Sequence, residues 1–415
     1  MQLQLEGSQA VARAVALCRP DVVCAYPISP QTHIIEALGA LVKSGALDAE
    51  FVNADSEFSA LSVTIGASAV GARAYTATAS QGLLFMMEAI YNAAGLGLPI
   101  VLTLANRAIG APINIWNDHS DAMSVRDSGW VQLFAENNQE AIDLHLLAFA
   151  LAEELSVPVM VNVDGFILTH AIERVDLPEP NQVDALVPPF LPRQSLDPDD
   201  PVSIGAMVGP EAFTEVRYLA QVRLRQALEV IPRLGAHHAE VLGRSAGHLV
   251  NGYHLEDAEV VVVAMGSVLG TIKDVVDELR RGGARVGVLS ITCFRPFPVE
   301  AVREALGRAE RLVVVEKAFS IGYGGILSTD IAHALRGLST PIHEVIAGLG
   351  GRPVWADSLR SVLLGALDGT LDDTTFLDLD HDLVDAELAR MAATRRSGPP
   401  AENVLRDLAD ARRGS

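Results

Sequence analysis

A single acidic residue at the start of a long apolar run is the most informative chemical feature of the sequence. Glu57 precedes the stretch from Phe58 to Ala72, whose apolar and small residues predict a buried helix. The start of a helix favours the anionic form of a carboxyl group, whereas burial raises the free energy of that form. Glu57 is therefore either an ordinary first-turn acid or cap, or a carboxyl group that is buried for its chemistry.

Three other polar residues each follow a stretch that predicts a buried strand. They are Ser29, Ser80 and Arg107, after strands expected at 22–26, 73–78 and 99–105. The carboxyl ends of parallel strands meet at one edge of a sheet, where ligands bind. We therefore expect the three residues on one rim. A guanidinium suits the binding of a carboxylate, so Arg107 is a candidate for that role, with a structural salt bridge as the alternative.

Two further patterns resemble binding sites, and each has a plainer interpretation. His119 lies close to Asp118 and Asp121, but the chain offers no matching ligand cluster, so we prefer a hydrogen-bonded loop to a metal site. The segments 266–267 and 322–325 are rich in glycine and could hold a phosphate. Neither matches a dinucleotide fingerprint or a P-loop in full, so we interpret both as tight turns.

The composition indicates a soluble protein of the α/β class. The chain has 415 residues, 49% hydrophobic and 20% charged, and a net charge of -21 that argues against nucleic acid as a partner. Cys18, Cys24 and Cys293 form no CxxC pair, so we expect neither disulfides nor a metal or iron–sulfur site held by this chain. The first residues do not resemble a signal peptide, and no stretch resembles a membrane span. We expect a cytoplasmic protein without a membrane partner.

Alternating helices and strands predict two α/β units with mostly parallel sheets. We expect the first unit at 1–177, a proline-rich linker and helix at 178–250, the second unit at 251–368, and an acidic, charged helical tail at 369–415. The expected helices of the first unit lie at 9–18 with Ser8 as N-cap, and at 31–43, 58–72, 83–94 and 141–155. In the second unit we expect strands at 260–264, 286–291 and 312–315 and a helix at 269–281.

Several motifs in order resemble one family. They are YPISP (26–30), DSEFSA (55–60), GASAVGAR (66–73), TASQG (78–82), NRA (106–108), DHSD (118–121), RDSGW (126–130) and QE (139–140). The chain resembles the alpha subunit of the 2-oxoacid:ferredoxin oxidoreductases, of the pyruvate:ferredoxin oxidoreductase type, over nearly its whole length to about residue 365. The resemblance implies a thiamine-diphosphate-binding domain of the pyrimidine type. FRPFP (294–298) is similar to the transketolase C-terminal-like domain that follows it in this family.

The resemblance also implies roles for individual residues. Glu57 matches the glutamate that activates the cofactor, through a hydrogen bond to the aminopyrimidine ring. Arg107 matches the residue that binds the substrate carboxylate, and Ser29 stands where the family usually has Thr, which leaves the exact substrate open. The pyrimidine pocket would be lined by Pro27, Ile28, Ser80, Gln81 and Gly82.

The cofactor and partners are implied in the same way. Thiamine diphosphate would be shared with a beta subunit that binds Mg2+ and the diphosphate, because this chain lacks a GDG motif followed by an Asn pair; the fragment 164–166 is the nearest. Gamma-type and delta-type (ferredoxin-like) subunits would carry the iron–sulfur clusters, with ferredoxin or a nicotinamide-reducing subunit as acceptor. Coenzyme A would be the co-substrate, and we expect a dimer of hetero-oligomers.

The implied reaction converts a 2-oxo acid and coenzyme A to acyl-coenzyme A and carbon dioxide, with pyruvate as the family's commonest substrate. Phenylglyoxylate, a branched-chain 2-oxo acid or 2-oxoglutarate stays open as substrate, and so does a nicotinamide acceptor. A thiamine enzyme without iron–sulfur clusters is a further alternative. In another class, the chain would be a non-catalytic scaffold subunit that kept the fold but not the chemistry.

Overall fold

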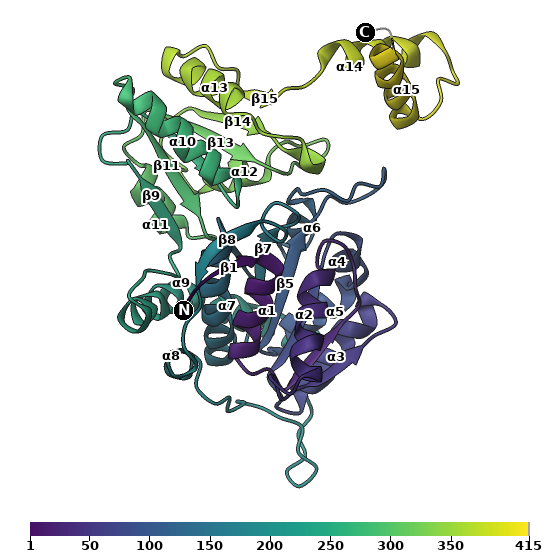
Figure 1. Cartoon of the computed structure of the whole chain (residues 1–415), viewed down its shortest axis with the longest axis vertical. Coiled ribbons are helices and arrows are strands. Elements are labelled where there is room, and N and C mark those ends of the chain that lie inside the picture. Colours follow the sequence, from purple (N-terminus) through teal and green to yellow (C-terminus); the bar gives the residue numbers. More distant parts are fainter. Residues whose placement is uncertain (414–415) are drawn as a thin grey trace.

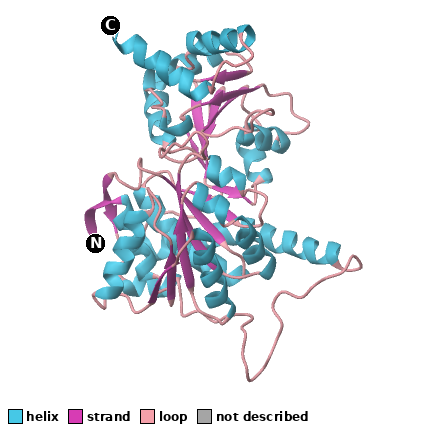
Figure 2. Ribbon diagram, turned by 90° about the vertical axis from the view of Figure 1, so that its right-hand side faces the viewer, coloured by secondary structure: helices cyan, strands magenta, loops and turns pink. Residues whose placement is uncertain are grey.

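Two mostly parallel β-sheets, one in each half of the chain, organise the molecule. The computed structural model describes residues 1–413. The N-terminal and C-terminal halves form two bodies stacked along the longest axis, and the last two helices, α14 and α15, are set apart from both (Figure 1). Sheets flanked by helices are visible in both bodies (Figure 2), as the α/β prediction requires. The predicted fold class is confirmed.

The first sheet has seven strands, and all neighbours are parallel except one outer pair. Every residue of its central strands is buried, which is typical of parallel strands covered on both faces. The spatial order is β12 (Cys293–Arg295), β6 (Val131–Phe134), β7 (Val159–Asp164), β5 (Ile100–Asn106), β4 (Ala74–Thr78), β2 (Val22–Ala25) and β3 (Glu50–Asn53).

Helices cover both faces of this sheet and give a three-layer unit. One apolar core lies under α1 (Gly7–Leu17), α2 (Thr32–Lys43), α7 (Asn138–Leu155) and the second half of α9 (Phe213–Leu242). The other face packs against α3 (Glu57–Ala69), α4 (Gln81–Phe85), α5 (Met87–Leu96) and α6 (Ser120–Ser124), and its apolar core continues into the C-terminal body. The two bodies are therefore joined by shared packing.

The second sheet has six strands, in the order β15 (Thr374–Phe376), β14 (Ile342–Ile346), β13 (Arg311–Glu316), β10 (Val260–Ala264), β11 (Val286–Ile291) and β9 (Val250–Tyr253). Only β9 runs antiparallel to its neighbour. The accompanying helices are α10 (Val268–Arg281), α11 (Val299–Leu306), α12 (Ile326–Ala334) and α13 (Ala356–Asp368), with a 3-10 turn at Leu349–Gly351.

The linker and the tail contain short helices of their own. The proline-rich segment holds α8 (Pro180–Leu186) before it runs as a long loop to α9, and the tail forms α14 (His381–Ala393) and α15 (Pro400–Arg413). The four-part division of the chain stays a prediction. The second sheet extends beyond both predicted limits of the second unit. Its strand β9 begins at Val250, in the predicted linker, and its strand β15 lies after residue 368, in the predicted tail.

Two local predictions in the first unit are wrong. Ser8 is no N-cap, because the helix begins at Gly7 and the Ser8 hydroxyl instead donates to the Thr169 carbonyl at 2.8 Å. Ahead of that helix lies an unpredicted strand, β1 (Gln2–Glu6), which pairs antiparallel with β8 (Ile172–Asp176). The helix expected at 83–94 is two helices, α4 and α5, that meet at Met86. No helix of the described chain is long and apolar enough to cross a membrane.

Candidate active site

The carboxyl ends of β2, β4 and β5 bring together the three residues that the sequence places on one rim. Arg107 Nη1 donates to the carbonyl of Ser29 at 2.9 Å, which joins the ends of β2 and β5. The backbone N–H groups of Ser80 and Arg107 both donate to Oδ2 of Asp121, at 3.0 and 2.9 Å, which joins the ends of β4 and β5. The prediction of a common rim is confirmed.

Two backbone carbonyls orient the Arg107 guanidinium. Its Nε donates to the carbonyl of Asn114 at 3.1 Å, and its Nη1 to that of Ser29. No ion pair of Arg107 occurs in the described part of the chain, so the structural salt bridge is not observed there. Burial lowers the pKa of the guanidinium, and the charge of Asp121 partly opposes this. A half-buried guanidinium that forms no ion pair in the described chain is suited to binding an anion.

The turn that carries Ser29 is fastened to the neighbouring strand by a residue that the sequence did not single out. Gln31 is fully buried; its Oε1 accepts from the N–H of Ile28 at 3.3 Å and its Nε2 donates to the carbonyl of Ala77 in β4 at 2.9 Å. Pro27 and Ser29 are exposed and Ile28 is half-buried. The Ser29 hydroxyl therefore lies at the surface of the rim, on a turn that Gln31 holds in place.

Glu57 is the first residue of α3, and its carboxyl group faces the turn after β4. Ser56 is the N-cap, since its Oγ accepts from the N–H of Ser59 at 3.2 Å, so Glu57 is a first-turn acid and not the cap. Its exposed fraction is only 9%. No hydrogen bond or ion pair links its carboxylate to another residue of the range 1–413. A largely buried acidic residue whose carboxylate has no protein donor in the described chain is unusual, because polar groups in protein interiors are nearly always paired.

Gly82 provides the space in which this carboxylate lies. A Cβ atom at Gly82 would be 2.9 Å from Glu57 Oε1 and 2.4 Å from Thr78 Oγ1. A side chain at this position would therefore displace Glu57. The Thr78 hydroxyl is itself buried and has no hydrogen-bond partner. The Glu57 carboxylate and the Thr78 hydroxyl, neither of which has a hydrogen-bond partner in the described chain, thus lie beside the turn that contains Gly82.

The backbone of Ser80 adopts a conformation that L-residues rarely use, with φ 49° and ψ -124°. Such strain costs on the order of 1–3 kcal/mol and concentrates at functional sites. The Ser80 hydroxyl donates to the carbonyl of Ala108 at 2.5 Å and lies against Oε1 of Gln81. Gln81 in turn lies beside Gly110, where a Cβ atom would be 2.6 Å from its Nε2. The turns after β4 and β5 are therefore held together by hydrogen bonds.

Asp121 joins these two turns, since it accepts hydrogen bonds from both of them. No role was predicted for it from the sequence. It is fully buried and also accepts from the Asn106 side chain at 3.0 Å. Burial raises its pKa to about 7, although the hydrogen bonds from Asn106, Arg107 and Ser80 lower it. Its place in the DHSD motif was visible, but only the folded chain brings that loop beneath both strand ends.

A second cluster of buried charges lies at the carboxyl end of β7, where the two bodies meet. Asp164 accepts from His119 Nε2 at 2.7 Å, from Lys317 Nζ at 2.9 Å and from the N–H of Ser267 at 3.1 Å. Lys317 also donates to the side chain of Asn117. Burial by itself raises the pKa of Asp164, but the charges of Lys317 and His119 hold it well below its ordinary value. His119 is thus hydrogen-bonded, as we expected.

Both glycine-rich segments of the second unit are tight turns whose donors are already bound. Ser267 donates its N–H and hydroxyl to Asp164. The turn at 322–325 leads into α12, whose first N–H groups, from Ile326, Leu327 and Ser328, donate to the buried carboxylate of Glu316 at 2.8, 2.8 and 3.1 Å. A protein carboxylate therefore occupies the helix N-terminus where a phosphate would bind.

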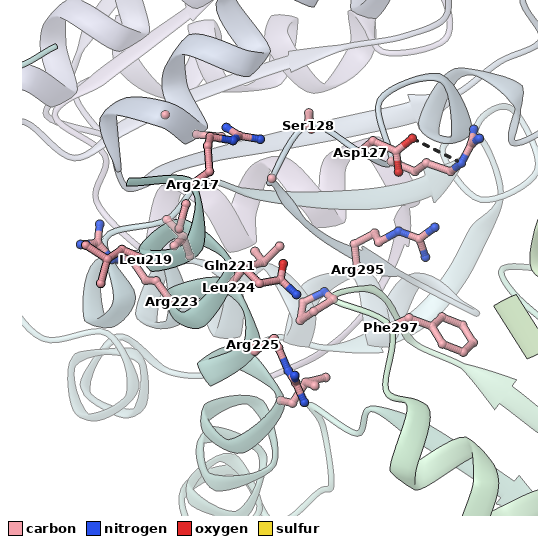
Figure 3. A pocket seen from close by; sticks show the side chains of 18 of the residues that line it. Asp127, Ser128, Arg217, Leu219, Gln221, Arg223, Leu224, Arg225, Arg295 and Phe297 are labelled. Carbon is pink, nitrogen blue, oxygen red and sulfur yellow. Dashed lines mark ion pairs between the residues drawn. The ribbon is translucent and has the colours of Figure 1, made fainter. Parts of the chain in front are cut away.

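A large cavity lies at the opposite edge of the first sheet from the rim. It has a volume of about 810 Å³ and separates the first half of α9 from the segments that lead into β6 and β7 (Figure 3). Its lining is strongly basic, with Arg126, Arg217, Arg223, Arg225 and Arg295. It contains none of the rim residues, so the candidate active site rests on the rim.

Comparison with known proteins agrees with this geometry. Residues 13–234 match the family described as pyruvate flavodoxin/ferredoxin oxidoreductase, thiamine diphosphate-binding, and residues 258–359 match pyruvate:ferredoxin oxidoreductase core domain II. The chain is 46% identical over 390 residues to the pyruvate synthase subunit PorA of Methanosarcina barkeri, covering 92% of this chain and 97% of the relative. It is 40% identical to the ketoisovalerate oxidoreductase subunit VorA of Pyrococcus abyssi, covering 86% and 91%.

Two solved structures share the fold at low sequence identity. One is 2-oxoglutarate:ferredoxin oxidoreductase from Magnetococcus marinus, with a TM-score of 0.67 and 17% identity over 88% of this chain, which spans 65% of that longer chain. The other is a split-gene transketolase, with a TM-score of 0.51 and 14% identity, covering 87% of this chain and 98% of that one. Both likenesses support the fold described above.

Proposed function

Since the chain belongs to the pyruvate:ferredoxin oxidoreductase family, we propose that it is the alpha subunit of a multi-subunit enzyme that decarboxylates a 2-oxo acid. The enzyme joins the acyl group to coenzyme A, releases carbon dioxide and passes two electrons to iron–sulfur clusters on partner subunits. The observation that carries the proposal is the carboxylate of Glu57, a residue that is only 9% exposed; it has no partner within residues 1–413 and lies against Gly82 on the rim.

The residues of the rim fit thiamine diphosphate. A buried carboxyl group without a protein donor suits the ring nitrogen of an aminopyrimidine, and the unpaired Thr78 hydroxyl is a second polar group at the same turn. Bound thiamine diphosphate would supply nucleophilic chemistry at the 2-oxo carbon of the substrate. Glu57 holds a proton at the pyrimidine nitrogen, and Pro27, Ile28, Ser80, Gln81 and Gly82 line the pocket.

Arg107 binds the substrate carboxylate in this proposal. The Ser29 and Asn114 carbonyls orient its guanidinium at 2.9 and 3.1 Å, and no carboxylate of the described chain forms an ion pair with it. The carboxylate of a 2-oxo acid matches the positive charge and the planar geometry of the guanidinium. The Ser29 hydroxyl, exposed on the same rim, positions the 2-oxo group.

Partner subunits complete the enzyme. The fragment at 164–166, which is the nearest to a GDG motif, has its aspartate bound to Lys317, His119 and Ser267. We therefore assign Mg2+ and the diphosphate to a beta subunit. The three cysteines are buried, and burial raises the pKa of Cys24 to about 11 and that of Cys293 to about 12, which suits neither thiolate ligation nor a cluster. The clusters belong to gamma-type and delta-type subunits in a dimer of hetero-oligomers that acts in the cytoplasm.

Pyruvate is the substrate that we propose, because the relatives at 42–46% identity are named as pyruvate synthase subunits. A ketoisovalerate enzyme at 40% identity is nearly as similar, so a branched-chain 2-oxo acid is the second candidate. The two differ in the size of the group beside the 2-oxo carbon. The purified complex, tested with pyruvate, 2-oxoisovalerate, 2-oxoglutarate and phenylglyoxylate, distinguishes them.

The assay follows coenzyme-A-dependent reduction of a viologen dye. We expect turnover of pyruvate only when coenzyme A is present. Turnover of 2-oxoisovalerate at a higher kcat/KM would change the substrate and keep the reaction. If a complex with bound cofactor and intact clusters turns over none of the four acids, the catalytic proposal is wrong and the non-catalytic scaffold is supported instead.

A further inference from the structure

Two histidines and a glutamate from three separate segments converge on the surface near the N-terminus. They are Glu6 at the end of β1, His33 in the first turn of α2 and His170 in the turn between β7 and β8. One ligand atom from each lies within 4.8 Å of those of the other two. We propose that these three residues form a binding site for a divalent transition-metal ion of the Zn2+ class.

The contacts within the cluster already approach those of a ligand set. His33 Nδ1 lies 2.7 Å from Glu6 Oε1, and the rings of His33 and His170 are 4.6 Å apart between centroids. Zinc bonds of about 2.0–2.2 Å to nitrogen and oxygen place neighbouring ligand atoms roughly 3.3 Å apart. Small rotations of the half-exposed side chains are sufficient to reach this spacing.

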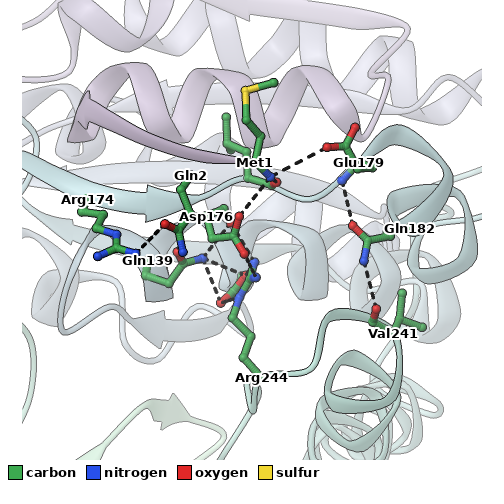
Figure 4. Close-up of polar contacts among 11 residues, drawn as sticks. Met1, Gln2, Gln139, Arg174, Asp176, Glu179, Gln182, Val241 and Arg244 are labelled. Atoms are coloured by element: carbon green, nitrogen blue, oxygen red, sulfur yellow. Dashed lines mark hydrogen bonds and ion pairs between the residues drawn. The ribbon is translucent and has the colours of Figure 1, made fainter.

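The backbone beneath the cluster is rigid, so little order must be created when an ion binds. Gly7 and Ser8 donate their N–H groups to the carbonyls of Ala171 and Thr169 at 3.0 and 2.8 Å. A Cβ atom at Gly7 would lie 2.1 Å from the carbonyl oxygen of Leu168, so only glycine permits this approach. The strand β1 is fixed at its other end as well, where the Met1 ammonium group contacts Asp176 at 3.0 Å (Figure 4).

A neighbouring hydroxyl group orients one of the proposed ligands. Thr169 Oγ1 is 2.8 Å from His170 Nδ1, which leaves Nε2 of that ring for the ion. The same hydroxyl accepts from the N–H of Phe166 at 2.8 Å and is thereby held in place. Hydrogen bonds of this kind set the tautomer and the ring orientation of histidines that bind metals.

Solvent reaches the site through a groove. A cavity of about 560 Å³ adjoins Glu6 and His33 and is also lined by Glu36, one turn along α2. Its lining carries the two glutamates against the single positive charge of Arg13. Two imidazoles and one carboxylate leave coordination positions open for water, and they favour Zn2+ and similar ions over Mg2+ or Ca2+, which prefer oxygen ligands.

The ion would cross-link β1, α2 and the β7–β8 turn. It would therefore raise the unfolding temperature of the chain, by an amount that grows with the logarithm of the free ion concentration above Kd. This site is separate from the proposed reaction, because none of its three ligands belongs to the rim.

The test uses the full-length chain, stripped of metal with a chelator and titrated with ZnCl2 by calorimetry at neutral pH. We expect one Zn2+ per chain and a rise in unfolding temperature. His33→Ala and His170→Ala should each weaken binding by about 10–100-fold or more, since even loss of a supporting residue costs that much.

His237→Ala is the matched control. His237 has the same exposed side-chain fraction as His33, 46%, and it also pairs with a glutamate, Glu240, at 3.5 Å. This variant should bind Zn2+ as the wild type does. Failure of the wild type to take up one equivalent, or equal affinity in His170→Ala and wild type, would overturn the proposal. If an alanine variant fails to fold in chelator, Glu6→Gln, which keeps the side-chain size, provides the same comparison.

Discussion

Two groups of buried charges at the same edge of the first sheet differ in how they are compensated. At the end of β7, Asp164 accepts hydrogen bonds from Lys317, His119 and Ser267, so its charge is fully paired. At the ends of β2, β3 and β5, Glu57 has no partner in the described chain, and Arg107 contacts only carbonyls. The paired cluster joins the two bodies, whereas we propose that the unpaired groups bind a ligand.

Two fully buried aspartates show the same contrast. The pKa of Asp164 is held well below its ordinary value by Lys317 and His119, against the effect of burial. The pKa of Asp121 is raised to about 7 by burial, because its partners are mainly neutral N–H donors. Burial alone therefore does not identify a functional group; what matters is whether the fold supplies its counter-charge.

Glu57→Gln should produce the largest loss of activity. If Glu57 assists proton transfer at the cofactor, the substitution should lower kcat by about 10²–10⁴-fold. The unfolding temperature should change little, because no hydrogen bond of the described chain is lost. Turnover by the assembled complex, together with thermal unfolding, measures both effects. Glu88→Gln, which changes the exposed first-turn acid of α5, is the control and should be fully active. Near-normal turnover in Glu57→Gln would contradict the assigned role.

Asp164→Asn should have the opposite effect to Glu57→Gln, because it should mainly lower the stability of the folded chain. Removing one partner leaves Lys317 buried and uncompensated, which destabilises a protein by about 3–5 kcal/mol. Urea or thermal unfolding of the full chain measures the loss. The double variant Asp164→Asn/Lys317→Met should recover part of the stability because it removes the orphaned charge. A loss below about 1 kcal/mol in the single variant would mean that the cluster is not the joint between the bodies.

Arg107→Ala should raise KM for the 2-oxo acid more than it lowers kcat. Hydrogen bonds to a charged group contribute about 1.5–3 kcal/mol, so kcat/KM should fall roughly 10–100-fold. The kcat/KM of Arg107→Lys should lie between those of the wild type and Arg107→Ala, since lysine keeps the positive charge but lacks the planar guanidinium. Steady-state kinetics with pyruvate gives the measurement, and Arg126→Ala, at the basic cavity on the opposite edge, is the control. An unchanged KM in Arg107→Ala would remove this residue from the substrate site.

The smallest expected effect is a pH dependence of stability that Asp121 should cause. The folded-state pKa of Asp121 is raised to about 7, so its contribution to stability is fully present below about pH 4 and is lost as the pH rises through 7. The slope from one such group is at most about 1.4 kcal/mol per pH unit. Asp121→Asn should lack this slope between pH 4 and 7. Parallel stability curves for variant and wild type would show that Asp121 does not titrate in this range.

Much of the fold could be predicted from local patterns. The apolar run at 260–264 and the mostly apolar run at 286–291, which includes Ser290, are strands with those bounds, because a parallel strand buried on both faces has few polar positions. The pattern does not reveal pairing partners. β1 was missed although its polar and apolar residues alternate as in a half-exposed strand, and its partner β8 lies far along the chain. β12 was missed because three residues from the second half of the chain add to the first sheet.

The sequence by itself determined the family, most of the alternation of strands and helices, and the polar residues that follow the strands of the rim, because these depend on residue type and short spacing. Only the tertiary structure decided which charges are compensated. Asp164 and Lys317 are 153 residues apart, and Asp121 lies beneath two strand ends to which no local pattern connects it. A counter-charge acts through distance in space, so the difference between a structural carboxylate and one left for a ligand became visible only in the folded chain.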